Sequence, residues 1–341
     1  MLQVENRTPF VPGMFIFPDE DGVDTLYVAV KATFTIGKGA PRVAEAQRPL
    51  VLADEYVGAP GQSSLKAATE AHLLKPATDV VVVGSAHAPG GKPAPSFGVS
   101  LAVGRLKKVL RVSGDRVWKK GLLGTSPSDP EPTRSVPLVW ERAYGGQEDL
   151  GGGKMAGEGR NPIGRGFVKK RAARELVGTP LPNFEDPARP LKSAGDAVTP
   201  AGLGFVAPSW QPRLGYAGTY DKAWQKRRAP YLPEDFDPRF FQVAPPDQIH
   251  PGFLKGGEPV ELVNLSPAGV QKFTLPVCSL EAEVVMGGAT ERPPLSLETL
   301  LLEPDQGRFS LVWRGALPCD KQVLKVQKVV FQVKALSGVA A

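Results

Sequence analysis

Alternating hydrophobic and polar residues mark the clearest predicted element of this chain, a strand over residues 26–36. One face of the strand carries only apolar side chains, namely Leu26, Val28, Val30, Ala32, Phe34 and Ile36. The other face is mostly polar and carries Thr25, Tyr27, Lys31, Thr33 and Thr35. A period of two held over this length is typical of a strand with one face on the core. We therefore expect a half-buried antiparallel strand here.

Strand patterns recur in the first and last thirds of the chain. The apolar run at 79–83 predicts a strand buried on both faces. The tripeptide Ser113-Gly114-Asp115 predicts a tight turn between two strands, and Pro304-Asp305-Gln306-Gly307 predicts a hairpin loop. A final strand over 321–334 changes its apolar phase near Gln327 and Lys328, which predicts a bulge. The remaining predicted strands are 97–103, 109–112, 116–118, 261–264, 272–275, 277–286, 295–303 and 308–314.

The middle of the chain, from Gly145 to about Gly257, has a different pattern. Gly and Pro clusters interrupt every periodic stretch, and only 168–176 and 222–228 are suited to short helices. This stretch also holds many large aromatic residues, namely Trp210, Tyr216, Tyr220, Trp224, Tyr231, Phe236, Phe240 and Phe241. Because aromatic side chains bury large areas, we expect ordered loops packed on a scaffold.

These patterns predict a mainly β fold with antiparallel, sandwich-like sheets, a long ordered loop-rich middle segment and few short helices. No internal repeat and no Gly/Ser linker separates the parts, so we expect one unit over residues 1–341. The change in pattern suggests an N-terminal β lobe at 1–145, the aromatic loop-rich segment at 146–257 and a C-terminal β lobe at 258–341.

Composition supports this fold and narrows the class of protein. The 341 residues include 38 Gly and 35 Pro, which argues against a helical bundle. With 42% hydrophobic and 22% charged residues, the chain is not expected to be disordered. The net charge of +6 arises largely from basic runs at 105–120 and 160–174. Such runs are usually solvated surface, but they also suit docking of an acidic partner. No aromatic residues are interleaved in a stacking pattern, so nucleic acid is not predicted.

The two cysteines and the first residues bear on location. Cys278 and Cys319 lie among apolar residues and suit neither a metal site nor a disulfide framework. No basic and then apolar leader opens the sequence, and no apolar run approaches the length of a membrane span. We therefore expect a cytoplasmic protein without membrane insertion.

Catalytic and metal-binding patterns are weak throughout the sequence. Its three histidines are not spaced as local metal ligands, and neither a phosphate loop nor a nucleophile elbow occurs. Asp19, Asp21 and Asp24 surround Gly22 without calcium-loop spacing, which favours a polar hairpin turn. We predict no metal, no cofactor and no catalytic residue. The neighbours Glu141 and Arg142 are expected to point to opposite faces of a strand.

A series of short motifs resembles a known family when the motifs are taken in order. They are Asn6-x-Thr8-Pro9-Phe10, Val30-Lys31-Ala32-Thr33-Phe34, Asp54-x-Tyr56-x-Gly58, Lys75-Pro76-x-Thr78-Asp79-Val80, Gly84-x-Ala86-x-Ala88-Pro89-x-Gly91, Gly114-Asp115-Arg116-x-Trp118, Glu141-Arg142-Ala143-Tyr144-Gly145-Gly146, Asn161-Pro162-x-Gly164-x-Gly166, Leu181-Pro182-Asn183, Trp210-x-Pro212-Arg213, Ala217-Gly218-Thr219-Tyr220-Asp221-x-x-Trp224, Leu232-Pro233-x-Asp235-Phe236-Asp237 and Ala244-Pro245-x-Asp247-Gln248. The set is similar to the domain of unknown function 2169 family of Gram-negative bacteria, over residues 6 to about 314.

The resemblance implies a role beside type VI secretion. It implies a non-enzymatic adaptor or chaperone that binds a toxic effector or its Pro-Ala-Ala-Arg-repeat (PAAR-type) tip domain. The adaptor would help to load that cargo onto the valine-glycine-repeat (VgrG-type) spike. It assigns no catalytic residue. Residue types common in interface hot spots give the candidate partner contacts Trp210, Arg213, Tyr220, Trp224, Arg228, Arg142 and Tyr144.

Three other interpretations stay open at this stage. The aromatic residues of the middle segment can simply hold the loops onto the sheets. The chain can instead be a hydrolase built around Glu141, Arg142, Asp235 or His87, or a secreted structural component of the spike tip.

Overall fold

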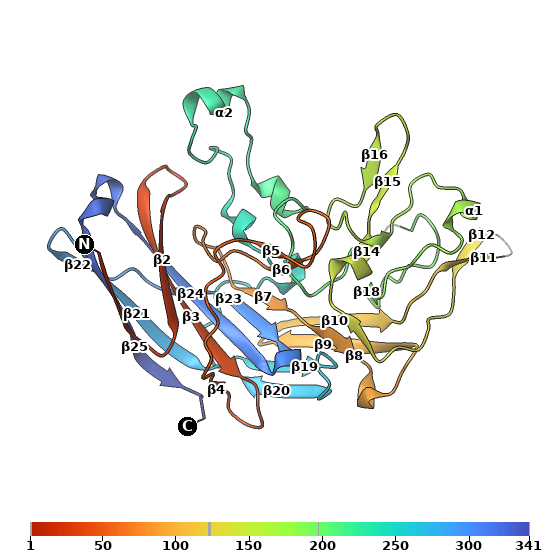
Figure 1. The fold of residues 1–341 in the computed structure, drawn as a ribbon, viewed down its shortest axis with the longest axis horizontal. Helices are drawn as coiled ribbons and strands as arrows, with labels where there is room; N and C mark the ends of the chain where they lie inside the picture. The colour runs from red at the N-terminus through yellow and green to blue at the C-terminus, as the bar shows by residue number, and fades with distance from the viewer. Residues whose placement is uncertain (1, 122–123, 197, 341) are drawn as a thin grey trace.

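The computed structural model describes residues 2–121, 124–196 and 198–340. It confirms a mainly β protein built from several largely antiparallel sheets and a few short helices. Figure 1 shows the large sheets along the lower part of the molecule, with loop-rich segments and small two-stranded ladders above them.

A six-stranded sheet occupies the middle of the molecule. Its strand order is β2-β3-β24-β23-β7, and β4 also pairs with β3. All of its pairings are antiparallel except that of β7 with β23. Its strands are β2 (Val11–Pro18), β3 (Asp24–Thr35), β4 (Arg42–Val43), β7 (Asp79–Val82), β23 (Ser296–Glu303) and β24 (Arg308–Pro318). The first and last thirds of the chain thus share one sheet, while the division at 145 and 257 stays a prediction.

Two further sheets flank the central one in Figure 1. One has the order β1-β25-β21-β22, in which β1 and β25 run parallel. The other has the order β18-β10-β9-β19-β20. The strands are β1 (Gln3–Arg7), β21 (Val277–Met286), β22 (Ala289–Glu291), β25 (Val326–Ser337), β9 (Ser96–Val103), β10 (Leu106–Ser113), β18 (Phe184–Glu185), β19 (Pro259–Val263) and β20 (Val270–Thr274).

Small ladders and short helices fill the rest of the fold. The ladders pair β5 (Glu55–Tyr56) with β6 (Leu65–Ala67), β8 (Ser85–His87) with β13 (Ser135–Pro137), β11 (Trp118–Gly121) with β12 (Gly124–Pro127), β14 (Tyr144–Gly145) with β17 (Arg165–Gly166), and β15 (Gln147–Asp149) with β16 (Met155–Gly157). The α-helices are α1 (Ala173–Leu176) and α2 (Lys222–Arg227), inside the two predicted helical stretches. The 3₁₀ helices are η1 (Pro89–Gly91), η2 (Trp140–Arg142), η3 (Arg213–Tyr216), η4 (Pro238–Phe241), η5 (Pro246–Gln248), η6 (Pro304–Gln306) and η7 (Asp320–Lys325).

The core is centred on aromatic side chains of the central sheet. Phe309 of β24 stacks on Phe34 of β3 with 5.3 Å between ring centroids, and on Phe273 of β20 at 5.0 Å. These stacks join the central sheet to the sheet that contains β20. A second, smaller cluster contains Trp118 and Tyr144, with Leu176, Leu181 and Leu191 around them.

The predicted strand at 26–36 is confirmed as β3, but the expectation that one of its faces meets water is wrong. Every residue from 25 to 34 is buried, because β2 and β24 flank the strand and residues 44–70 cover its polar face. There the Lys31 ammonium binds the Glu70 carboxylate at 2.8 and 3.0 Å. The Thr33 hydroxyl lies 3.1 Å from that of Ser310. The alternating pattern therefore separates an apolar face from an internally paired polar face.

Two local predictions had different outcomes. The expected turn at Ser113-Gly114-Asp115 does not pair the flanking strands, because β10 pairs with β9 around Gly104 and β11 pairs with β12. Gly114 is instead packed so closely that a Cβ there would lie 1.8 Å from the Glu131 carbonyl oxygen. The bulge near Gln327 is confirmed, since Val285 pairs with Lys328 and Met286 pairs with Val326.

Candidate partner-binding surface

Residues 218–235 form a projection that carries α2 at its tip, and we call it the α2 projection. Figure 1 shows it rising above the central sheet, with both of its connections returning toward the sheet. From 219 to 231, all residues are exposed except Ala223, Trp224 and Arg228, which are half-buried. So exposed a segment keeps its shape only if internal hydrogen bonds replace the missing core.

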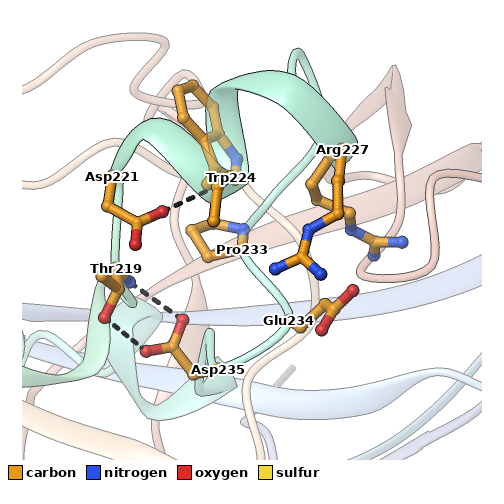
Figure 2. Close-up of a pocket in the computed structure, with 9 residues that line it drawn as sticks. Thr219, Asp221, Trp224, Arg227, Pro233, Glu234 and Asp235 are labelled. Atoms are coloured by element: carbon orange, nitrogen blue, oxygen red, sulfur yellow. Dashed lines mark hydrogen bonds between the residues drawn. The ribbon is translucent and has the colours of Figure 1, made fainter.

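The base and the start of the helix supply several of those bonds. Asp235 accepts hydrogen bonds from the Thr219 backbone N–H at 2.9 Å and from the Thr219 hydroxyl at 2.7 Å. These bonds hold the pKa of Asp235 below its ordinary value. The Asp221 carboxylate caps α2 by accepting from the Trp224 N–H at 2.8 Å. Figure 2 shows both contacts at one side of the cavity beneath α2.

The side chains of Trp224 and Arg228 supply further hydrogen bonds that hold the projection together. The indole N–H of Trp224 donates to the Tyr231 carbonyl at 2.8 Å. The Arg228 guanidinium donates to the Leu232 carbonyl at 2.8 Å and also to the carbonyl of Glu20. Glu20 lies in the turn between β2 and β3, so Arg228 ties the projection to the central sheet. The Arg228 guanidinium thus binds carbonyl groups within the protein itself.

The outer surface of the projection combines aromatic and cationic groups. Tyr220 is 54% exposed and its ring meets that of Trp224 edge-on at 4.7 Å, while Tyr231 is 41% exposed. Three exposed cations follow along the helix, namely Lys222, Lys226 and Arg227. A cavity of about 200 Å³ lies beneath the helix and is lined by Thr219, Asp221, Ala223, Trp224, Arg227, Arg228, Pro233, Glu234 and Asp235. Figure 2 shows the Arg227 and Glu234 side chains on the side opposite Thr219.

Two predicted partner contacts, Trp210 and Arg213, lie inside the protein near the base of the projection. Trp210 is 1% exposed and meets the Trp140 ring edge-on at 6.0 Å. The Arg213 guanidinium donates to the carbonyls of Val206 at 2.7 Å and Phe240 at 2.8 Å. Burial lowers the pKa of Arg213 to about 10. Both side chains are therefore enclosed in this structure.

The other two predicted contacts lie in another part of the fold. Tyr144 is buried in the cluster around Trp118, and its hydroxyl donates to the Asp196 carbonyl at 3.3 Å. Arg142 is partly exposed and binds Asp115 at 3.1 Å and the Asn183 side chain at 3.2 Å. Of the seven candidates, only Tyr220, Trp224 and Arg228 come together in one place.

Most of the chain matches one known protein family. The family model described as "Uncharacterized protein conserved in bacteria (DUF2169)" matches residues 21–314. The chain belongs to the DUF2169 family. The match spans the central sheet from the β2–β3 turn into β24 and includes the α2 projection. No curated protein and no solved structure matches the chain.

The side chains considered for hydrolysis have separate partners in this DUF2169 protein. Glu141 lies on η2, where its carboxylate accepts from the Ser64 backbone N–H at 2.8 Å and from the Ser64 hydroxyl. His87 lies 2.6 Å from the Asp305 carboxylate, and Asp235 binds Thr219. Residues 140–142 form a 3₁₀ helix and not the expected strand, yet Glu141 and Arg142 still reach different partners.

Part of the first basic run is internal. The Lys108 ammonium is buried and binds Asp247 at 2.7 Å and the Gly202 carbonyl at 2.7 Å. Burial lowers its pKa, although Asp247 opposes the shift. Arg116 is also buried and pairs with Glu185 at 2.8 Å. Only the remaining basic residues of that run are exposed to solvent, namely Arg105, Lys107, Arg111, Lys119 and Lys120.

Sequence reasoning missed how the projection is held. It treated Asp235 only as a carboxylate for catalysis and gave no role to Thr219. The available signal was Gly218, which has a φ of +79° and precedes Thr219 at the start of the projection. Asp237 accepts from the Arg239 N–H at 2.9 Å and so caps the start of η4, which gives the second carboxylate of this motif a local structural role as well.

Among the residues that the structure describes, no helix combines the length and apolar character required to cross a membrane.

Proposed function

We propose that this DUF2169 protein is a non-enzymatic adaptor that binds a protein partner through its α2 projection. The observation that carries this proposal is the exposed Tyr220 ring, which packs on the half-buried Trp224 beside the exposed cations Lys222, Lys226 and Arg227. The segment is braced by its own hydrogen bonds. Aromatic and arginine side chains dominate the energetics of many protein interfaces. A braced segment also loses little conformational entropy on binding.

The partner we propose is a type VI secretion effector or its PAAR-type tip domain, which the adaptor brings to the VgrG-type spike in the cytoplasm. Membership in the family supports this proposal through the expected role of its members. The exposed cations favour an acidic patch on the partner, because complementary charge speeds and orients association.

The test is direct binding of the purified full chain to purified effector, tip and spike proteins encoded beside its gene. Each pair is measured separately by size-exclusion chromatography and calorimetry. Tyr220→Ala should weaken binding of the cognate protein about tenfold, because an interface anchor contributes more than about 1 kcal/mol. Arg227→Gln should have a smaller effect on the affinity than Tyr220→Ala. Its effect should be larger at low salt than at high salt, because salt screens the charge.

Leu324→Ala is the matched control, because Leu324 on η7 is 93% exposed and lies outside the projection. It should leave the affinity unchanged. Absence of a complex with all three proteins would refute the adaptor role. Equal losses for Tyr220→Ala and Leu324→Ala would instead refute the α2 projection as the binding surface.

A further inference from the structure

A second cavity, distinct from that of the α2 projection, lies beside the ladder of β14 and β17. Its volume is about 240 Å³. The two strands run parallel, with Tyr144 opposite Arg165 and Gly145 opposite Gly166. They come from the two Gly-rich motifs of the middle segment, which the adaptor proposal leaves without a role. The cavity lining contains two arginines, Arg165 and Arg171, and no acidic residue.

Arg165 is held in place but its charge is not neutralised. Its Nε–H donates to the Glu141 carbonyl at 2.9 Å, which fixes the guanidinium against η2. Within the described part of the chain, no carboxylate lies within ion-pair distance of it. Burial, and next the nearby charge of Arg142, lower the pKa of Arg165, although the charges of Asp115 and Glu141 oppose the shift. An anion in the cavity would oppose both effects by stabilising the charged guanidinium, because a partly desolvated cation gains most from a charged hydrogen-bond acceptor.

Arg171 adds a second cation that is only partly compensated. One of its terminal nitrogens donates to the Phe167 carbonyl at 3.0 Å. Its nearest carboxylate, that of Glu148, lies 3.8 Å away from Nε. That carboxylate already accepts backbone hydrogen bonds from Lys169 at 2.7 Å and Lys170 at 2.9 Å. The segment 160–174 contributes six basic and no acidic residues, of which Arg160 and Arg174 pair with Glu158 and Glu175.

The rest of the lining mixes polar and apolar groups, since Gln147 and Thr179 line the cavity beside four apolar side chains. Trp118, Phe167, Val168 and Pro180 contribute side chains to it. The cavity is smaller than the roughly 300–1,000 Å³ typical of pockets for larger organic ligands. Two arginines in one cavity, beside an apolar wall made by these four side chains, suit a carboxylate attached to one apolar residue better than a bare inorganic anion.

We propose that this cavity binds the carboxylate of a peptide, with Arg165 and Arg171 donating to its oxygens. The neighbouring apolar side chain of the peptide would pack on Phe167 and Val168. Two charged donors facing one carboxylate give both affinity and orientation. The inference does not rest on the α2 projection, because the two sites share no residue.

The probe is N-acetyl-leucine, titrated into the ¹⁵N-labelled full-length protein and followed by NMR. It should shift the amide resonances of Gly145, Gly146 and Gly166 with saturation. N-acetyl-leucinamide, which lacks the charge, should bind at least about tenfold more weakly, as expected when a charged hydrogen bond is lost. Equal binding of acid and amide would overturn the proposal. Inorganic phosphate binding as tightly as N-acetyl-leucine would also overturn it, since the apolar wall would then contribute nothing.

Variants locate the binding groups. Arg171→Gln should weaken N-acetyl-leucine binding about tenfold. Arg165→Lys keeps a charge but not the fixed fork, and should weaken it to a similar degree. Arg174→Gln is the control, because Arg174 is 88% exposed on α1 and does not line the cavity. An effect of Arg174→Gln equal to that of Arg171→Gln would mean that only general charge matters, and would refute the site.

Discussion

The buried ion pair of Lys31 and Glu70 gives the sharpest test of how the fold is held together. Lys31 lies in β3, an interior strand of the six-stranded sheet, and is 2% exposed. Its ammonium meets both Glu70 oxygens, at 2.8 and 3.0 Å. Lys31→Met keeps most of the side-chain volume and removes only the charge. The substitution therefore measures what the lysine charge contributes to the free energy of unfolding, with the packing largely intact.

The expected loss follows from what remains around Glu70. One of its oxygens still accepts from the Val51 N–H at 2.8 Å, but the carboxylate loses its ion-pair partner. The charge of Arg314, which donates to the Glu70 backbone carbonyl, still acts on it without replacing the lost pair. Breaking a buried pair from one side typically destabilises a protein by about 3–5 kcal/mol, because an uncompensated charge stays buried. The double variant Lys31→Met/Glu70→Gln removes both charges and keeps an acceptor for Val51. It should recover about 2 kcal/mol of that loss, since a neutral amide is cheaper to bury.

Urea unfolding followed by tryptophan fluorescence and circular dichroism measures these free energies. Coincidence of the two probes is required before a single free energy is assigned. Lys272→Met serves as the matched control. Lys272 pairs with Glu261 at 3.2 Å on the surface of β20, so the same substitution there should cost less than about 1 kcal/mol.

Two outcomes would refute this reasoning. A loss below about 1 kcal/mol for Lys31→Met would mean that water reaches Glu70 in the native state. A double variant as unstable as the single one would show that lost packing of the lysine stem, and not the orphaned carboxylate, sets the cost.

Three further perturbations probe other parts of the molecule. Burial raises the pKa of Glu298 to about 7, so the native state keeps a proton that the unfolded chain releases above about pH 4.5. Native stability should fall by up to about 3 kcal/mol as the pH rises through that window, and Glu298→Gln should remove this part of the fall in urea titrations. Trp210→Ala should cost about 3–5 kcal/mol by leaving a cavity beside Trp140, as read from urea midpoints. Asp235→Asn should weaken its two bonds from Thr219 and speed tryptic cleavage within α2, while the thermal midpoint of the rest of the protein stays constant.

Most strands of the large sheets could be predicted from local sequence patterns. The segments that cover those strands, and the burial they cause, could not. The strand at 277–286 matches β21 residue for residue, because its pattern and flanking turns are local. The burial of Lys31 depends instead on Glu70, a residue in a covering segment with no strand pattern of its own. The turn predicted at Gly114 is wrong for a similar reason. Glycine is required there because the backbone of Glu131 packs closely against it, and not because the chain forms a hairpin.

The candidate site shows the same limit. Two of the residues chosen by type, Tyr220 and Trp224, meet on the segment that projects, and their role as partner contacts stays a prediction. Residue type did not separate them from Trp210 and Arg213, which are equally suited to an interface but are enclosed by Trp140 and Phe240. Exposure is set by long-range packing, and no local pattern in the loop-rich segment records it.

The parallel pairing of β1 with β25 has a consequence for how the protein folds. Gln3 pairs with Lys328, so the first strand finds its neighbour only after more than 300 residues have been synthesised. In the same way, β3 waits for β24. Contacts this distant in sequence are associated with slow folding, and unpaired strands are exposed to aggregation in the meantime. A nascent chain that has not yet reached residue 326 therefore lacks the strand that joins β1 to β21, and the ribosome-bound intermediate is the species most in need of chaperone protection.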